Sequence, residues 1–321
     1  MRRHRRRTRG RWEAAAARQT PRVRRSPPPS ARLLSVTMSV RGAAVTHTPH
    51  FMSALGGGTI AYGTVVEFLF SGMSVDRRFT QTQKPYAADD LETMSEARRY
   101  QAHIFGLVRP HVGSRVLEVG CGIGTMTRKL LDVAQQVTCI EPNLDCAARA
   151  REKLGAHPRF AIRISHLEEC DPDELRQQRF DTVVCVNVLE HIEDDVRALR
   201  LFRDVVANMG GQVLIFVPAV QALYGPHDAA LGHHRRYSKR TLTRAFDAAG
   251  LDVVTMRYTN PIGLLGWIYN LYLTGNTEHT TSQVRLFERF VAPWALPLER
   301  LAAPPIGLSL FAVGRARLHA A

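Results

Sequence analysis

Three glycines at alternate positions are the first residues whose spacing indicates chemistry. Gly120, Gly122 and Gly124 follow the apolar run 116–119 and precede a stretch of helical character that begins at Thr125. This order predicts a buried strand, a tight turn and the start of a helix. Glycine suits such a turn because it tolerates positive φ and because a ligand can approach a backbone that has no Cβ atom. The turn therefore predicts a ligand site whose kind the following residues must define.

An acidic residue follows the next predicted strand. Glu141 stands directly after the apolar run 136–140, where a carboxylate can accept hydrogen bonds from two ribose hydroxyls. A nicotinamide dinucleotide site shares this feature, but its G-x-G-x-x-G pattern requires a third glycine at the position of Thr125. The spacing therefore argues against the usual dinucleotide fingerprint.

A further motif occupies residues 180–192 and reads Phe-Asp-Thr-Val-Val-Cys-Val-Asn-Val-Leu-Glu-His-Ile. With Glu118, the glycine turn and Glu141, it resembles the class I S-adenosylmethionine-dependent methyltransferases over about residues 95–260. A narrower resemblance, to a bacterial subgroup of small-molecule methyltransferases (type 11/12-like), is carried by Pro218, Leu223-Tyr224-Gly225, Asp228 and Gly232-His233-His234-Arg235-Arg236-Tyr237. It implies transfer of a methyl group to a small molecule, at oxygen, with carbon and nitrogen as alternatives.

The resemblance also implies where the cofactor, S-adenosylmethionine, is bound. Glu118 would hold its amino group, directly or through water, and Glu141 would bind its ribose. The complete expected set is Glu118, Gly120, Cys121, Gly122, Gly124, Glu141, Pro142, His166, Leu167, Asn187 and Val188.

The adenine contact departs from the family pattern. Where the family often carries an acidic side chain before the fourth strand, this chain reads Ser165-His166-Leu167. Either His166 acts as a neutral acceptor or the backbone of Leu167 makes the contact alone.

Methyl transfer requires alignment of the acceptor, exclusion of water and removal of a proton where the acceptor carries one. Histidine titrates near neutral pH and suits the last task. We expect His191, His233 and Tyr237 to be the catalytic or substrate-facing residues. The alternatives are a structural hydrogen bond for His191, and a loop cluster joined by Arg235 and Arg236 for the other two.

No resident metal is expected from the sequence. The alternative is a site with two histidines and one carboxylate, for which neighbouring arginines are unfavourable. Its candidate ligands would be His227, Asp228, His233 and His234.

Apolar strand patterns alternate with helical patterns from residue 95 onward. This alternation, with the resemblance, predicts an α/β fold that is Rossmann-like and doubly wound, with a mostly parallel seven-stranded sheet and helices on both faces. Strands are expected at 115–119, 136–140, 159–164, 180–186, 211–217, 251–258 and near 306–314. Helices are expected at 95–108, 125–132, 143–154, 194–208 and 238–249, the last with Ser238 as N-cap and Gly250 at its end.

The basic charge belongs mainly to one end of the chain. Residues 1–37 contain twelve Arg and one Glu, a charge of +11 out of the formal +14. We expect residues 1–72 to be a disordered or poorly ordered Arg-, Pro- and Gly-rich extension. Alternatively, the natural start lies at Met38, Met52 or Met73. The methyltransferase domain is expected at 73–321, with an apolar insertion at about 260–304 that caps the pocket or receives an apolar substrate.

Composition bounds the remaining possibilities. Five cysteines without a C-x-x-C pair indicate reduced core residues and a cytoplasmic protein. The longest apolar runs are too short to span a membrane, and membrane contact is a weaker possibility.

A lipid or lipid-linked sugar is the alternative acceptor of the methyl group. A nucleic-acid-binding protein that acts through its Arg-rich end is the alternative from another class, and nucleic acid is an unlikely partner. The oligomeric state is not encoded in any pattern.

Overall fold

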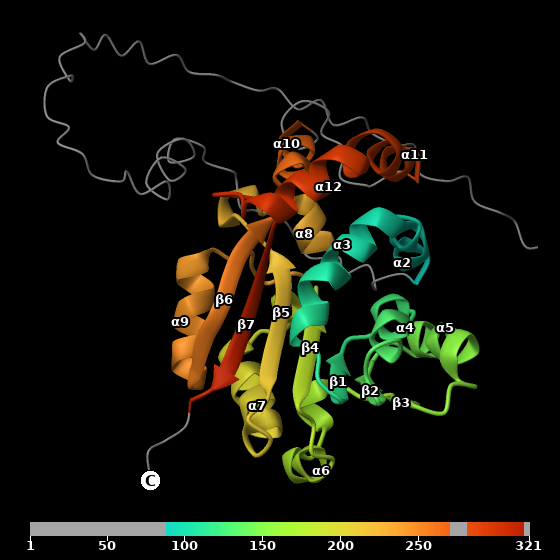
Figure 1. Cartoon of the computed structure of the whole chain (residues 1–321), viewed down its shortest axis with the longest axis vertical. Helices are drawn as coiled ribbons and strands as arrows, with labels where there is room; N and C mark the ends of the chain where they lie inside the picture. The colour runs from blue at the N-terminus through green and yellow to red at the C-terminus, as the bar shows by residue number, and fades with distance from the viewer. Residues whose placement is uncertain (1–87, 270–280, 318–321) are drawn as a thin grey trace, which may run out of the picture. The chain divides into compact units, whose positions relative to one another are not determined.

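The computed structural model describes residues 88–269 and 281–317 (Figure 1). Their strands form one seven-stranded sheet in the order β3-β2-β1-β4-β5-β7-β6. The strands are Arg115–Val119 (β1), Gln136–Ile140 (β2), Phe160–Arg163 (β3), Thr182–Val186 (β4), Gln212–Pro218 (β5), Leu251–Thr259 (β6) and Ser309–Ala316 (β7). Only β7 runs antiparallel to its neighbours. The predicted doubly wound, mostly parallel sheet is confirmed. The expected extension 1–72 and the alternative start sites lie outside the described residues.

The sheet reverses its winding direction beside β1. The chain builds outward from β1 through β2 to β3, then returns to place β4 on the other side of β1. Val119 pairs with Ile140 of β2 and with Cys185 of β4, so these three strands end side by side. Because the strands are parallel, their carboxyl ends open into one crevice, which is where an α/β sheet of this kind binds its ligands.

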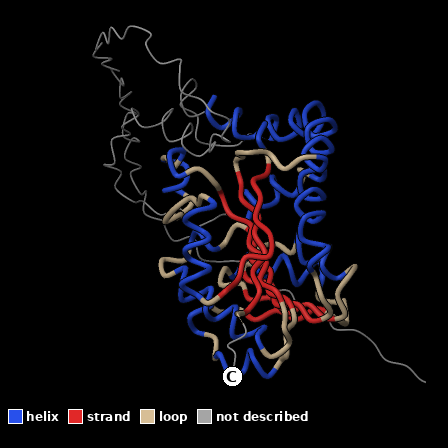
Figure 2. The backbone as a smooth tube through the Cα atoms, turned by 60° about the vertical axis from the view of Figure 1, so that its left-hand side comes forward, coloured by secondary structure: helices blue, strands red, loops and turns tan. Residues whose placement is uncertain are grey.

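Helices cover both faces of the sheet (Figure 2). In chain order to β6 they are Ala88–Ser95 (α2), Arg98–Val108 (α3), Thr125–Leu131 (α4), Leu144–Leu154 (α5), Pro172–Gln177 (α6), Asp195–Ala207 (α7), Pro226–Ala230 (α8) and Lys239–Ala249 (α9). Side chains alternate between the faces of a strand. Val116 belongs to an apolar cluster that includes residues of α3, α4 and α5, whereas the next residue, Leu117, belongs to a cluster that includes residues of α6, α7 and α9. Two apolar clusters thus hold the sheet between two helical layers.

Helix α9 begins and ends at the capping residues that the sequence predicts. Ser238 Oγ accepts a hydrogen bond from the backbone N–H of Thr241, and Gly250 ends α9 in the left-handed conformation, as predicted. The helix expected at 95–108 is α3, which begins three residues later, at Arg98, and ends at Val108 as expected, whereas the preceding helix α2, which ends at Ser95, was not predicted. The helices α6 and α8 were not predicted, since they have only six and five residues and show little periodicity.

The expected insertion at 260–304 contains helices. They are Pro261–Tyr269 (α10), Thr281–Leu286 (α11), the π-helical turn Phe287–Val291 (η6) and Ala292–Leu301 (α12). Buried Glu299 of α12 approaches His103 Nε2 of α3 at 2.9 Å and accepts the backbone N–H of Asn260 at 2.9 Å. Glu288 accepts the backbone N–H groups of Arg99 and Tyr100 at the start of α3. The insertion is therefore attached to α3 by polar groups on its inner face.

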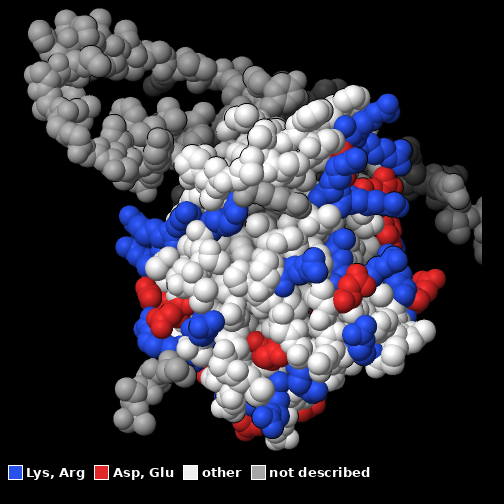
Figure 3. All heavy atoms as spheres, viewed as in Figure 1, with Lys and Arg blue, Asp and Glu red and all other residues white. Residues whose placement is uncertain are grey.

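The outer face of the insertion is apolar. In Figure 3 the surface near α10 and α12 is mostly uncharged, with Lys and Arg at its edge. No helix in the part of the chain that the structure describes is long and apolar enough to cross a bilayer. The five cysteines are buried and form no disulfide, as the sequence indicated.

Candidate active site

A cavity of about 410 Å³ lies at the carboxyl ends of β1, β2 and β4. Most residues of the expected cofactor set contribute to its wall, together with His191. Those that line it are Glu118, Gly120, Cys121, Gly122, Glu141, Pro142, His166, Leu167, Asn187, Val188 and His191. Gly124, His233 and Tyr237 are not among the lining residues.

The glycine turn has a backbone that only glycine adopts easily. Gly120, Gly122 and Gly124 have φ values of 72°, 53° and 83°. A Cβ atom on Gly120 would overlap Val188, and one on Gly124 would lie 2.8 Å from Leu154 Cδ1. Gly120 therefore keeps the cavity wall open, whereas Gly124 allows α4 to pack on α5.

Glu141 is fixed across the turn by two backbone groups. Its Oε2 accepts the N–H of Gly122 at 2.8 Å, and its Oε1 accepts the N–H of Asn143 at 2.9 Å. Burial raises the pKa of Glu141, while these two hydrogen bonds act in the opposite direction. Each carboxylate oxygen has lone-pair capacity beyond one bond, so a diol that enters the cavity can still be bound.

Glu118 is a buried carboxyl group on β1 beneath the turn. Its side chain accepts a hydrogen bond from Cys139 Sγ at 3.4 Å and is 2% exposed. Burial raises the pKa of Glu118 to about 7, with hydrogen bonds from Thr127 and Cys139 opposing the rise. Because a buried carboxylate is stabilised by a nearby positive charge, this wall of the cavity fits a ligand that carries an ammonium group.

His191 lies on the wall that follows β4. It ends the short 3-10 helix Leu189–His191 (η3) and lies four residues beyond Asn187, whose φ is 53°. Burial and then the nearby His233 lower the pKa of His191 to about 4, against hydrogen bonds with the backbone of Gly232 and Leu231. His191 is therefore a neutral imidazole at physiological pH.

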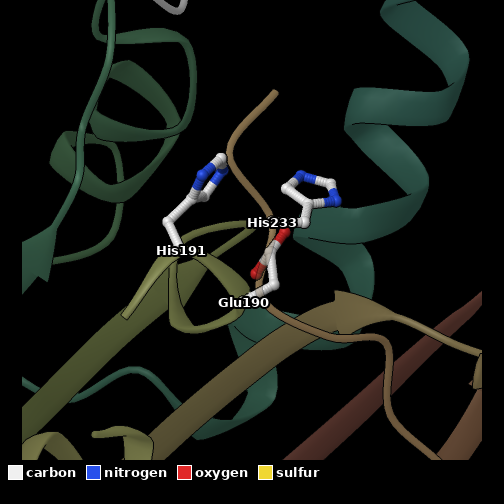
Figure 4. A group of neighbouring side chains, drawn as sticks. All are labelled: Glu190, His191 and His233. Atoms are coloured by element: carbon white, nitrogen blue, oxygen red, sulfur yellow. The ribbon is translucent and has the colours of Figure 1, made fainter. Parts of the chain in front are cut away.

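His233 meets His191 from a different part of the chain (Figure 4). The two rings are edge to face, with centroids 4.6 Å apart. Nδ1 of His233 is 2.8 Å from Oδ1 of Asp228, and the same oxygen accepts a hydrogen bond from Nε of Arg236 at 2.9 Å. Burial acts to raise the pKa of Asp228, but its bond to His233 and the charge of Arg236 outweigh burial and lower it. The loop after β5 thus carries an oriented imidazole to the edge of the site.

A sequence model of the family described as "Methyltransferase domain" matches residues 81–256, which is more than half of the chain. The chain belongs to this methyltransferase family. The strand order of its sheet and the cavity at the strand ends agree with a class I methyltransferase. The cofactor of this family is S-adenosylmethionine. The methyltransferase is 33% identical over 90 residues to a ubiquinone biosynthesis O-methyltransferase of Xanthomonas euvesicatoria, covering 27% of this chain and 36% of the relative.

Another relative shares a longer segment. The ubiquinone biosynthesis O-methyltransferase of Methylocella silvestris is 34% identical over 159 residues, covering 45% of this chain and 60% of the relative. The methyltransferase thus spans about a third to 60% of the length of these two relatives. Among solved structures, the CcbJ methyltransferase of Streptomyces caelestis is 16% identical with a TM-score of 0.45, covering 70% of this chain and 90% of that one. An S-adenosylmethionine-dependent methyltransferase of Mesorhizobium loti is 18% identical with a TM-score of 0.44, covering 64% and 93%.

Tyr237 of the methyltransferase lies away from the cavity, contrary to the expectation that it faces the substrate. The backbone of Tyr237 pairs with Ala219, beside the end of β5, and its ring is buried in the core. Its hydroxyl donates a hydrogen bond to Oδ2 of Asp195 at 2.8 Å. Burial and the charge of Asp195 raise the pKa of Tyr237. Tyr237 therefore fixes the loop to α7.

Several lining residues were missed by the sequence analysis. Leu91 and Met94 of α2 and Gln101 of α3 approach the cavity from helices that precede the sheet. Glu168 lines the wall near His166, two residues beyond the position considered for an acidic adenine contact. The sequence thus offered an acidic residue close to the position expected for the adenine contact. The contribution of α2 to the cavity wall, in contrast, depends on tertiary packing, which no sequence motif indicates.

The metal set considered from the sequence is only partly assembled. His227 packs edge to face against Trp267, and Asp228 is engaged by His233 and Arg236. His234 is exposed.

Proposed function

We propose that this methyltransferase transfers the methyl group of S-adenosylmethionine to a hydroxyl oxygen of a small molecule. The observation that carries the proposal is the neutral imidazole of His191 on the cavity wall after β4, across β1 from the carboxylate of Glu141 after β2. The O-methyltransferase names of the partially aligned relatives support oxygen as the acceptor atom.

The residues on the β1 and β2 side fit the cofactor. Glu118 would hold its ammonium group, Glu141 would bind the ribose hydroxyls, and the backbone of Gly120 would lie against the methionine portion. The adenine would lie near His166, Leu167 and Glu168. When bound, S-adenosylmethionine supplies an activated methyl group, so the protein must mainly align the acceptor and exclude water.

His191 acts at the acceptor end of the proposed site. Its neutral ring can form a hydrogen bond with the acceptor hydroxyl and turn an oxygen lone pair toward the cofactor side. Leu91 and Met94 contribute apolar side chains to the cavity, which helps to keep water out. His191 is thus proposed as the residue that orients the acceptor.

Cofactor binding is tested by calorimetry with two glycine variants. Gly120→Ala should weaken S-adenosylmethionine binding by at least about tenfold, or ~1.4 kcal/mol, because the new methyl group overlaps Val188 on the cavity wall. Gly210→Ala is the matched control, since Gly210 also has positive φ but its Cβ would meet no atom within 4 Å. Absence of binding by the wild type, or equal binding by both variants, would contradict the proposal.

Acceptor chemistry is tested with methyl-labelled cofactor and a panel of phenols, catechols and sugars. We expect label on oxygen, and we expect His191→Asn to lose turnover while it retains cofactor affinity. Label that appears only on carbon or nitrogen would reject oxygen as the acceptor atom.

A lipid or lipid-linked sugar is a second candidate acceptor, favoured by one surface feature. The outer face of the insertion carries a stripe of large apolar side chains at helical spacing, which are 58% to 84% exposed: Leu286, Phe290, Trp294, Leu298 and Leu301. Arg285 and Arg289 are exposed on the same segment. Apolar and basic groups together fit the interface of an anionic membrane. Because α11 and α12 pack on α2 and α3, this surface adjoins helices that line the cavity.

The second candidate is tested by co-sedimentation with phosphatidylglycerol–phosphatidylcholine vesicles. The wild type should bind with a blue shift of tryptophan fluorescence, and Trp294→Ser/Leu298→Ser should bind more weakly. Leu144→Ser is the matched control, because Leu144 is an exposed leucine on α5. No binding by the wild type, or equal loss in the control, would reject a membrane role for the stripe.

A further inference from the structure

Three side chains beside the acceptor end form a group that the proposed methyl transfer does not fully use. Glu190, His191 and His233 each offer one potential ligand atom, and these atoms lie within 4.8 Å of one another. Figure 4 shows them arising from η3 and from the loop after α8, and gathering at one place. The motif at residues 180–192 contains only Glu190 and His191, and the loop after α8 supplies His233.

Glu190 lacks a partner that its burial demands. The residue is 1% exposed, and among the described residues its Oε2 atom has no hydrogen-bond partner. An unpaired polar oxygen in the interior costs free energy unless a ligand, ion or water satisfies it. The carboxyl group is thus arranged to accept a cation.

The two imidazoles are oriented by their own neighbours. Asp228 engages Nδ1 of His233, so Nε2 is the nitrogen that remains for a ligand. Asp228 is itself held by Arg236 and by the backbone N–H of Gly225 at 3.1 Å. Backbone groups of Gly232 and Leu231 likewise bond to His191. Metal-binding histidines commonly have such a carboxylate or backbone partner on the other ring nitrogen, which fixes the ring for coordination.

The surrounding charges permit a cation. The guanidinium of Arg236 is paired with Asp228 at 2.9 Å, and that of Arg235 is paired with Asp195 at 2.9 Å. His234 is exposed, and its backbone N–H donates to the carbonyl of Glu190. The arginines that made a metal seem unfavourable from the sequence are thus neutralised by partners of their own.

We propose that Glu190, His191 and His233 form a binding site for a divalent transition-metal ion at the acceptor end of the cavity. Two imidazoles and one carboxylate suit Zn²⁺, Fe²⁺, Co²⁺ or Ni²⁺ and leave coordination positions open. An acceptor hydroxyl in an open position would lose its proton more easily and would be aligned for attack. This role in catalysis rests on the proposed function, whereas cation binding itself does not. With the ion bound, His191 orients the acceptor through the metal.

The test uses the full chain after dialysis against EDTA and titration with Co²⁺. We expect one ion per chain and visible d–d absorption, without the near-ultraviolet thiolate band that cysteine ligands would give. Glu190→Gln removes the charged ligand and should weaken binding about 100-fold. Asp228→Asn removes the charge that orients His233 and pairs with Arg236, and should weaken binding about 10- to 100-fold. Glu152→Gln and His157→Asn, on and after α5, should bind Co²⁺ like the wild type.

Calorimetry with S-adenosylmethionine on the same samples shows whether each variant retains a folded cofactor site and separates the two proposals. A wild-type chain that binds the cofactor but neither Co²⁺ nor Zn²⁺ would overturn the metal site alone. Cobalt binding without cofactor binding would overturn the proposed function alone. Equal Co²⁺ affinity in the wild type and in folded Glu190→Gln would also overturn the metal site.

Discussion

The wall proposed to bind the cofactor (Glu118, Gly120–Gly122 and Glu141, here called the cofactor wall) and the helical cap (α2, α3, α11, η6 and α12) meet at one cavity, which the cap lines through α2 and α3. The two regions are built differently. In the cofactor wall, Glu141 bonds to the backbone of Gly122 and Asn143, which are 19 and 2 residues away in the sequence. In the cap, Glu299 contacts His103 across 196 residues, and Glu288 contacts Arg99 across 189. One region is arranged by strand ends and short turns, the other by a few buried polar contacts between distant segments.

Because of this difference, we expect a substitution in one region to leave the structure of the other region largely intact. The glycine turn depends on the sheet, which two apolar clusters stabilise on both faces. The cap turns large apolar side chains outward and buries carboxylates inward. Loss of a contact in the helical cap should therefore lower the free energy of unfolding by a large amount and change the free energy of cofactor binding only slightly.

The largest effect is expected from Glu299→Ala. The variant leaves the ring of His103 and the backbone N–H of Asn260 without their carboxylate partner in a buried place, which should lower the free energy of unfolding by about 3–5 kcal/mol. Urea unfolding measures the loss, and calorimetry should show a much smaller change in cofactor affinity.

The matched control for this prediction is Glu96→Ala, which removes an exposed pair with Arg285 in the same cap. This substitution should lower the free energy of unfolding by about 0–1 kcal/mol. Burial acts to raise the pKa of Glu299, but its contacts with His103, Thr259 and Asn260 outweigh burial and lower it. Its contribution is therefore present above the unfolded pKa and is lost as pH falls through the lower folded value. Equal losses in both variants would show that the buried contact does not hold the cap.

Glu118→Gln should remove a pH dependence that belongs to the cofactor wall. The folded pKa of Glu118, about 7, lies well above the ordinary value of a glutamate, so the folded chain binds a proton more tightly than the unfolded chain. Stability from this group is present at low pH and is lost as pH rises to about 7, a change of roughly 3 kcal/mol.

Urea unfolding of the wild type and the variant at pH 5 and pH 8 isolates that contribution. Cofactor should reduce the wild-type decline, because its ammonium group stabilises the ionised carboxylate. A decline of equal size in Glu118→Gln would assign the pH dependence to other groups.

The same contrast explains what could be predicted from the sequence. Gly120, Glu141 and His191 follow buried strands directly or closely, and parallel strand ends meet at one edge, so periodicity was enough to expect them around one cavity. Leu91 and Met94 reach it only because α2 packs over the strand ends. Their short helix carries no motif for that position.

The loop after β5 shows the limit of arguments from residue type. His233 was selected as a histidine near the site, but its orientation depends on Asp228, and its meeting with Glu190 depends on the fold. Tyr237 had equally suitable chemistry. Backbone pairing with Ala219 turns its side chain toward the core, and sequence spacing does not specify that direction.

The smallest expected effect compares two helix N-caps, Asn143 at the cavity wall and Ser238 at the start of α9, which does not line the cavity. Asn143 Oδ1 accepts the backbone N–H groups of Asp145 and Cys146 at 3.0 and 3.1 Å, and Asn143 lines the cavity. Asn143→Ala and Ser238→Ala should each cost about 1 kcal/mol of stability through loss of a cap. Only Asn143→Ala should also weaken S-adenosylmethionine binding, by about two- to fivefold, because loss of the cap loosens the turn whose backbone N–H at position 143 holds Glu141. If calorimetry finds the same cofactor affinity in both variants, Glu141 is held by the turn itself and does not depend on the start of α5.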